Sequence, residues 1–167
     1  GTKSIIHTHS SSGAGEFPLD KLERVLRNTE EIVTVDELKG LLERSKRPRA
    51  YVGYETSGKV HLGHMLTCNK LLDLQKSGFD IVVLLADLHA FLNEKGTLEE
   101  VRKTADYNRD CFMALGLDPE RTEFVYGTDY QLKPEYMLKI LQMARNTTLN
   151  RARRSMDEVS RNAENPM

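Results

Sequence analysis

The chain has 167 residues, a formal net charge of −1 and two cysteines. This length allows one domain with a hydrophobic core, and the balanced charge excludes a globally basic nucleic-acid-binding protein, so any polyanion site has to be a local patch. The longest apolar run, Ile81 to Ala86, is too short to cross a membrane, and the first residues lack the pattern of a signal peptide. We therefore expect a cytoplasmic protein with no membrane association, in which Cys68 and Cys111 are reduced core residues.

Residues 1–18 are rich in Ser, Gly and Thr and show no hydrophobic periodicity. The string SSSGAGEF is typical of a linker or a tag, and we expect this segment to be disordered. His7 and His9 could bind a metal only weakly, since two flexible ligands make a poor site, and we expect no protein-bound metal. The remaining residues, 19–167, are predicted to form one partial domain.

The first part of that domain, residues 19–48, is predicted to be helical. Leu22, Val25 and Leu26 recur at helical spacing, and a second helix begins at Thr34, a favourable N-cap. This second helix has to end before Pro48, because a proline disfavours the α conformation of the residue that precedes it.

Residues 49–130 combine three β-prone runs, AYVGY, DIVVLLAD and EFVYG, with two amphipathic segments between them. One predicted helix runs from His61 to Lys76 and is closed by Gly78, and the other runs from the TLEE capping box to Gly116. This alternation indicates right-handed βαβ units in a parallel sheet whose strands are covered on both faces. The predicted fold class is α/β, a Rossmann-like sheet with ligands beyond the carboxyl ends of the strands.

Residues 131–167 are predicted to be helical after Pro134, with no further strand. A doubly wound domain normally has five or six strands, so three strands correspond to its first half. The open sheet edge and the apolar positions between Met137 and Leu149 predict that the chain is not a stable monomer.

The sequence YVGYETSGKVHLGHML contains the strongest candidate for a functional site. His61 and His64 lie in the first turn of a predicted helix that follows a strand and a loop, and helix N-termini favour anions. Gly63, between the histidines, and Gly53, near the end of the strand, leave room for a flat ring such as adenine. The arrangement suits stabilisation of an α-phosphate during nucleotidyl transfer. A structural histidine pair is the alternative, and a metal pair would need further ligands that are not evident nearby.

The segments AYVGYETSGKVHLGH, GFDIVVLLADLHAFLN, YGTDYQL and TTLNRARRSM follow one another in this order. With them the chain resembles, from about Leu22 to Pro166, the first half of the catalytic domain of the archaeal-type tyrosyl-tRNA synthetases, a class I aminoacyl-tRNA synthetase family. The resemblance implies an enzyme that forms tyrosyl-adenylate from L-tyrosine and ATP, with Mg²⁺ accompanying the nucleotide, and then esterifies tRNA(Tyr). HLGH corresponds to the HIGH signature of this family.

The resemblance also implies roles for individual residues. His61 and His64 would be catalytic and would bind ATP together with Gly53 and Gly63. Arg154, in the basic run RARR, would contact the tRNA. The residues around the amino acid would be Tyr51, whose hydroxyl meets the substrate phenol, Glu55 near the substrate's amino end, His89 beside the pocket, and Gln131 and Tyr136 close to it.

The resemblance does not reach the second half of the family's catalytic domain. That half supplies an aspartate and two glutamines to the tyrosine pocket as well as the KMSKS loop, and these are not in this chain. The family places residues 131–167 near the subunit interface, so we expect a homodimer or a complex with a complementary C-terminal half. Two alternatives stay open: a small HxGH nucleotidylyltransferase, and a non-catalytic module that binds nucleotide, tRNA or a partner.

Overall fold

The computed structural model describes residues 20–159 of the chain. The predicted linker of residues 1–18, with its two histidines, lies outside the described residues, as do residues 160–167. In chain order the elements are α1 (Lys21–Leu26), α2 (Val35–Arg44), β1 (Arg49–Tyr54), α3 (Leu62–Lys76), β2 (Asp80–Leu85), α4 (Asp87–Leu92), α5 (Leu98–Ala114), η1 (Pro119–Arg121), β3 (Thr122–Tyr126), α6 (Gly127–Gln131), α7 (Pro134–Arg145) and α8 (Leu149–Val159).

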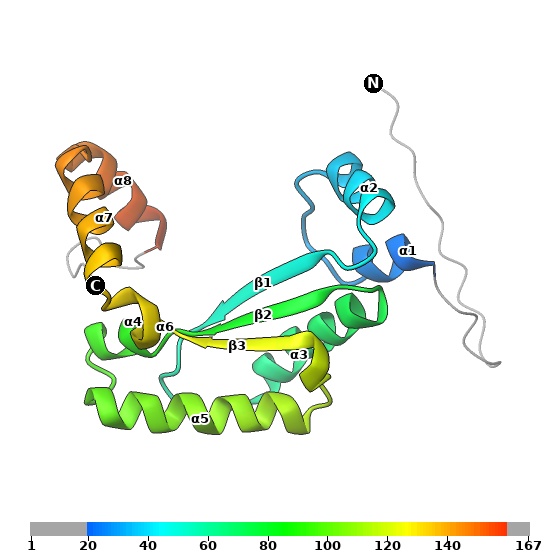
Figure 1. The fold of residues 1–167 in the computed structure, drawn as a ribbon, viewed down its shortest axis with the longest axis horizontal. Coiled ribbons are helices and arrows are strands. Elements are labelled where there is room, and N and C mark those ends of the chain that lie inside the picture. The colour runs from blue at the N-terminus through cyan, green and yellow to red at the C-terminus, as the bar shows by residue number, and fades with distance from the viewer. Residues whose placement is uncertain (1–19, 160–167) are drawn as a thin grey trace.

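The three strands form one parallel sheet in the order β1-β2-β3 (Figure 1). In the central strand, Ile81 lies opposite Ala50 of β1 on one side and opposite Thr122 of β3 on the other. A helix connects each strand to the next, which is the repeating unit of a Rossmann-like sheet. The predicted α/β fold class is therefore confirmed.

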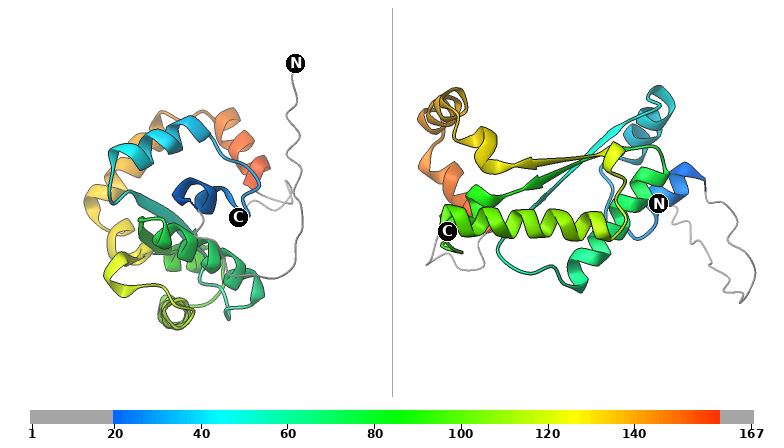
Figure 2. Two further views of the ribbon diagram at one scale, coloured as in Figure 1. Left: turned by 90° about the vertical axis from the view of Figure 1, so that its right-hand side faces the viewer. Right: turned by 60° about the horizontal axis from the view of Figure 1, so that its bottom comes forward.

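One face of this sheet carries the hydrophobic core. Ile81, Val83 and Leu85 of β2 have 1% of their surface exposed or less. They pack in one cluster with Cys68 of α3 and Phe112 of α5, and both helices lie on the same side of the sheet (Figures 1 and 2). The sheet is thus fixed to these two helices by apolar burial along its central strand.

The opposite face of the sheet is open in the described part of the chain. Val82 and Leu84 of β2 are only partly buried, and Tyr51 on the neighbouring strand is 68% exposed. The prediction that the strands are covered on both faces is wrong for these residues. The reason is that right-handed crossovers which move in one direction along a sheet put both connecting helices on the same side.

The strand ends differ from the prediction in two places. The run Asp80–Asp87 does not stay extended: β2 ends at Leu85, and Asp87 begins the short helix α4. In the same way, β3 passes directly into the short helix α6 at Gly127. The C-terminal ends of α3 and α5 agree with the prediction. Gly78 and Gly116, which follow these helices, adopt φ values of 101° and 106° in the left-handed region.

Polar contacts fix α1 to α3. Arg27, the C-cap of α1, donates two hydrogen bonds of 2.8 and 2.6 Å to the carboxylate of Asp73. Lys70 donates to the carbonyl oxygen of Arg27 at 2.8 Å. Lys70 and Asp73 lie in the C-terminal half of α3, the helix that begins at the histidine pair. These contacts therefore anchor α3 to α1 at the end away from the histidines.

Candidate active site

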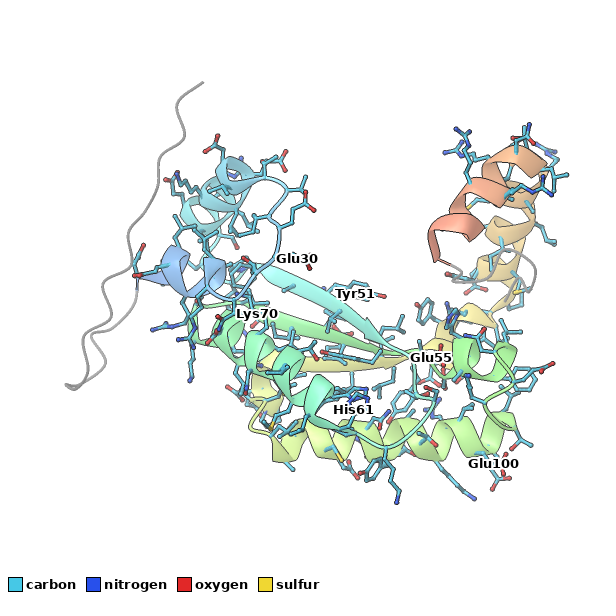
Figure 3. All side chains as sticks on the ribbon, turned by 180° about the vertical axis from the view of Figure 1, so that it is seen from behind. Glu30, Tyr51, Glu55, His61, Lys70 and Glu100 are labelled. Carbon is cyan, nitrogen blue, oxygen red and sulfur yellow. The ribbon has the colours of Figure 1, made fainter. Side chains whose placement is uncertain are left out.

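The candidate site lies at the carboxyl ends of the three strands. The loop after β1 leads to α3, β2 leads to α4, and β3 leads to α6. Figure 3 shows Tyr51 on β1, Glu55 just after this strand and His61 at the start of α3. The α7–α8 pair lies beyond the same ends of the strands, whereas α1 and α2 lie beyond their amino ends (Figure 1).

The two histidines cap α3 in a reciprocal way. His61 is the N-cap residue, and its Nδ1 accepts a hydrogen bond from the N–H of Gly63 at 3.1 Å. His64 returns the interaction, since its Nδ1 accepts from the N–H of His61 at 3.3 Å. The two imidazoles therefore make the hydrogen bonds that Ser and Glu side chains make in a common capping box. Their ring centroids are 4.1 Å apart.

These two hydrogen bonds determine the tautomer of each ring. A neutral imidazole has one N–H and one acceptor nitrogen, so a ring that accepts at Nδ1 carries its proton on Nε2. Burial lowers the pKa of His64, and the neighbouring His61 lowers it further, so the neutral form is favoured. The pair thus presents two Nε2–H donors at the N-terminus of α3, an arrangement suited to an anion.

Neighbouring side chains lie close to the two glycines of the predicted site. A Cβ on Gly63 would lie 3.0 Å from Cε1 and 3.1 Å from Nδ1 of His61, so the imidazole occupies that space. A Cβ on Gly53 would lie 3.3 Å from the hydroxyl oxygen of Tyr51, which extends along β1. Each glycine therefore leaves room for the neighbouring His61 or Tyr51 side chain close to the backbone.

Tyr130 of α6 links Tyr51 of β1 with Tyr136 of α7. Tyr130 of α6 packs edge-on against Tyr136 of α7, with 5.3 Å between the ring centroids. Burial raises the pKa of Tyr130, and the nearby phenols of Tyr136 and Tyr51 raise it further. The structure thus brings the predicted Tyr51 and Tyr136 to the same region and adds Tyr130, which the sequence reasoning missed although it directly precedes Gln131.

Glu55 and His89 meet at the carboxyl edge, although they come from different strand ends. Nε2 of His89 lies 3.6 Å from Oε2 of Glu55. The same carboxylate oxygen accepts a hydrogen bond of 2.9 Å from Nδ2 of Asn93, one turn further along α4. Asn93 carried no signal in the sequence, because its role depends on a residue that is 38 positions away.

A buried carboxylate joins the ends of β2 and β3. Asp87 is fully buried and accepts hydrogen bonds from the N–H of Leu88 at 2.8 Å, and from the N–H and hydroxyl of Thr128 at 2.8 and 2.6 Å. Arg102 of α5 lies 3.6 Å from this carboxylate. A Cβ on Gly127 would lie 3.0 Å from Oδ1 of Asp87 and 2.5 Å from Oε1 of Gln131, so Gln131 folds back over its own helix.

Arg154 is not brought together with the other predicted residues. It is exposed on α8, which follows α7 at the end of the described chain. No cluster of three or more His, Cys, Asp or Glu side chains that could hold a metal occurs in the described residues. In the part of the chain that the structure describes, no helix has the length and apolar character needed to cross a membrane.

The parallel sheet, with an HxGH sequence at the first helix after its edge strand, has the features of the nucleotide-binding half of a class I synthetase. The model of the family described as tRNA synthetases class I (W and Y) matches residues 43–167. The chain belongs to this family.

Within this family, the chain is similar to archaeal tyrosine–tRNA ligases. It is 66% identical over 148 residues to the Tyrosine--tRNA ligase of Methanosarcina mazei, covering 89% of this chain and 47% of the relative. The crystal structure of the Archaeoglobus fulgidus tyrosyl-tRNA synthetase complexed with L-tyrosine matches with 62% identity and a TM-score of 0.79, covering 88% of this chain and 46% of that chain. The resemblance to the archaeal-type tyrosyl family is thus confirmed.

A tryptophanyl enzyme is also similar but more distant. The tryptophanyl-tRNA synthetase of Aeropyrum pernix matches with 34% identity and a TM-score of 0.58, covering 68% of this chain and 32% of that chain. The chain spans about half the length of the curated relatives it matches.

Proposed function

We propose that the chain is the part of a tyrosine–tRNA ligase that binds ATP and L-tyrosine and forms tyrosyl-adenylate. In this reaction a carboxylate oxygen of tyrosine attacks the α-phosphorus of ATP, and pyrophosphate leaves. Negative charge grows on the oxygens of the α-phosphate as the new bond forms. Transfer of the tyrosyl group to tRNA(Tyr) would follow.

The reciprocal capping of α3 by His61 and His64 is the observation that carries this proposal. It fixes both rings, directs protons to both Nε2 atoms and favours the neutral state of His64. Donors that are oriented before the reaction stabilise charge that develops only in the transition state, and so they affect the rate more than ground-state binding. We assign both histidines to the α-phosphate, with Gly53 and Gly63 beside the nucleotide.

Any Mg²⁺ would arrive with the phosphates of ATP, since the described residues offer no group of ligands for a metal of their own. The residues of this chain would then act on the nucleotide by hydrogen bonds from His61, His64 and the N-terminal turn of α3.

The amino acid would bind beside Tyr51 on the open face of the sheet. The hydroxyl of Tyr51 would meet the substrate phenol, with Gln131 and Tyr136 close by, and Glu55 and His89 at the amino end. The 66% identity to a tyrosine–tRNA ligase, against 34% to a tryptophanyl enzyme, supports tyrosine as the amino acid.

The C-terminal helices would face the tRNA. A hollow of about 590 Å³ between α7 and α8 is lined by Lys139, Asn146 and Arg151 among others. Arg154 lies one turn beyond Arg151 on α8 and is exposed. Positive side chains on one surface suit the phosphates of an acceptor stem.

The remaining assignments follow from the same proposal. The protein would act in the cytoplasm, as a homodimer or together with a complementary C-terminal half. Residues 19–48 would form the N-terminal helices, residues 49–130 the βαβαβ part and residues 131–167 a connecting and dimerising segment of one partial catalytic domain.

The test is ATP–pyrophosphate exchange with each amino acid. To supply a complete pocket, the chain is fused to the part of the Archaeoglobus fulgidus ligase that it does not cover. We expect exchange with tyrosine and little with phenylalanine, because a bound phenylalanine would cover the hydroxyl of Tyr51 and leave it without a partner. Equal exchange with both amino acids, or none with tyrosine, would contradict the proposal.

A further inference from the structure

Asn93 restrains Glu55 at the carboxyl edge of the sheet. Asn93 is the C-cap of α4, and its Nδ2 donates a hydrogen bond of 2.9 Å to Oε2 of Glu55. Glu55 directly follows β1, whereas α4 follows β2. The bond therefore joins the ends of two neighbouring strands at the point where ligands of such sheets bind.

The ion-pair partners of Glu55 differ from those of the other two carboxylates near this edge, Asp87 and Asp129. Asp87 and Asp129 lie 3.6 and 2.6 Å from the guanidinium group of Arg102. Among the described residues, Glu55 forms an ion pair with no lysine or arginine, and the imidazole of His89 lies 3.6 Å from its carboxylate. Its side chain is 29% exposed, so a partly desolvated carboxylate at this edge is available to a cation from outside the chain.

We propose that Asn93 is a positioning residue that holds the Glu55 carboxylate for the ammonium group of the amino-acid substrate. The inference rests on the proposed function and deepens it by assigning a chemical group of the substrate to a pair of residues. Asn93 bonds Oε2, and among the described residues no donor bonds Oε1, which leaves that oxygen to the ligand.

The amide is suited to this role because it orients a carboxylate without neutralising it. An amide N–H is a neutral donor, whereas a lysine or arginine at this position would compete with the substrate ammonium for the same charge. A free glutamate also samples several rotamers and loses that freedom when it binds a ligand. Restraint by Asn93 removes part of this entropic cost before binding.

The experiment compares a ligand that has the ammonium group with one that lacks it. In the fused protein described above, KM for L-tyrosine is measured by ATP–pyrophosphate exchange. The inhibition constant of 3-(4-hydroxyphenyl)propanoate, which is tyrosine without its amino group, is measured beside it. We expect Asn93→Ala to raise KM for tyrosine about 10-fold, the effect of losing a hydrogen bond to a charged group, with KM for ATP and the inhibition constant unchanged.

Two control variants separate positioning from folding. Asn69→Ala changes an exposed asparagine of α3 and should change none of these constants, because no hydrogen bond or ion pair joins Asn69 to Glu55. Glu55→Gln removes the charge, and in that background Asn93→Ala should have no further effect on tyrosine, as expected for two residues that act as one unit.

The outcomes that would overturn the inference differ from those that affect the proposed function. If Asn93→Ala weakens the deaminated analogue as much as tyrosine, Asn93 has only a structural role. If the unsubstituted protein binds both compounds equally, Glu55 does not bind the ammonium group, although exchange activity would still support the ligase. Absence of tyrosine-dependent exchange in the unsubstituted protein would remove the proposed function itself, and the inference with it.

Discussion

Each histidine of the HLGH sequence uses its two ring nitrogens for different purposes. Nδ1 of His61 and of His64 accepts a backbone N–H of the first turn of α3, and this leaves both Nε2–H groups for a ligand. The structural and functional interpretations of the pair are therefore compatible, because the bonds that stabilise the helix also fix the donors. Substitution by alanine removes both at once, so other residues are needed to separate the two roles.

His61→Asn separates the cap from the donor. Asparagine is among the best N-cap residues, so the free energy of unfolding should stay close to that of the unsubstituted protein, whereas His61→Ala should lower it by about 1 kcal/mol. Asparagine is too short to reach the position of Nε2. In the fused protein, adenylate formation should therefore fall by about 10²–10³-fold in both variants, with tyrosine affinity nearly unchanged. Urea unfolding and single-turnover kinetics measure the two effects, and equal losses in tyrosine affinity and rate would show that the pair is only structural.

Protonation of His64 should weaken the cap in acid. Burial and the adjacent His61 place the pKa of His64 in the folded protein below its ordinary value of 6.5, so the unfolded chain takes up a proton first as pH falls. The stability from neutral His64 is therefore complete above about pH 6.5 and is lost as pH falls through the lower folded pKa.

The comparison for this prediction is His64→Gln, measured by urea unfolding at about pH 7.5 and at pH values below 6.5. Glutamine at this position can still accept from the N-cap N–H, but it does not titrate. The difference in unfolding free energy between the unsubstituted protein and His64→Gln should shift in favour of the variant in acid. The same pH dependence in both proteins would assign the acid sensitivity to another group.

Two short helices depend on one buried junction. α4 has six residues and α6 has five, and helices of that length are not stable by themselves in water. Asp87 begins α4 and bonds the start of α6 through Thr128, while Arg102 stacks over the ring of Tyr126 at 3.7 Å from its centroid. The positions of Asn93 and Gln131, on or just after these helices, depend on these tertiary contacts.

Asp87→Ala should lower the free energy of unfolding by about 3 kcal/mol, because it leaves the N–H and hydroxyl of Thr128 and the charge of Arg102 without a buried partner. The matched control is Asp129→Ala. Asp129 binds the same arginine at 2.6 Å, but its side chain is 55% exposed, so the loss should stay below about 1 kcal/mol. Chemical denaturation of both variants gives the comparison, and similar losses would mean that burial of Asp87 contributes little.

At the scale of the whole molecule, the described chain leaves apolar surface uncovered. The sheet face with Val82 and Leu84 is only partly buried, and β1 pairs with a strand on one side only. On α7, Leu138 and Leu141 are 56% and 63% exposed, and no residue of this helix is buried. An unpaired strand edge and an apolar helix surface both favour association with another chain.

We predict that the isolated chain is not a stable monomer. Light scattering over a concentration series should give a mass above the 19.0 kDa of one chain. Leu138→Glu with Leu141→Glu should shift the equilibrium toward the monomer, because burial of two carboxylates opposes association. Leu98→Glu, which changes a leucine that is 41% exposed on α5, should not. A 19.0 kDa species that persists at high concentration and melts cooperatively would contradict the prediction.

The sequence by itself determined the features that depend on neighbouring residues. The strand and helix pattern of residues 49–126 follows from local hydrophobic periodicity, and the ends of α3 and α5 follow from Gly78 and Gly116, whose φ values of 101° and 106° are costly for other residues. The histidine pair is also local, since the two residues are three positions apart and meet within one turn of a helix.

Only the tertiary structure decided which face of the sheet is covered and which side chains meet at its carboxyl edge. The strand sequences are apolar on both faces, but two crossovers in the same direction place α3 and α5 on one side. Glu55 and Asn93 are 38 positions apart, and Asp87 and Thr128 are 41 apart. Such pairs have no periodic or spacing signal, because parallel strands bring their ends together only after the intervening helix has folded back across the sheet.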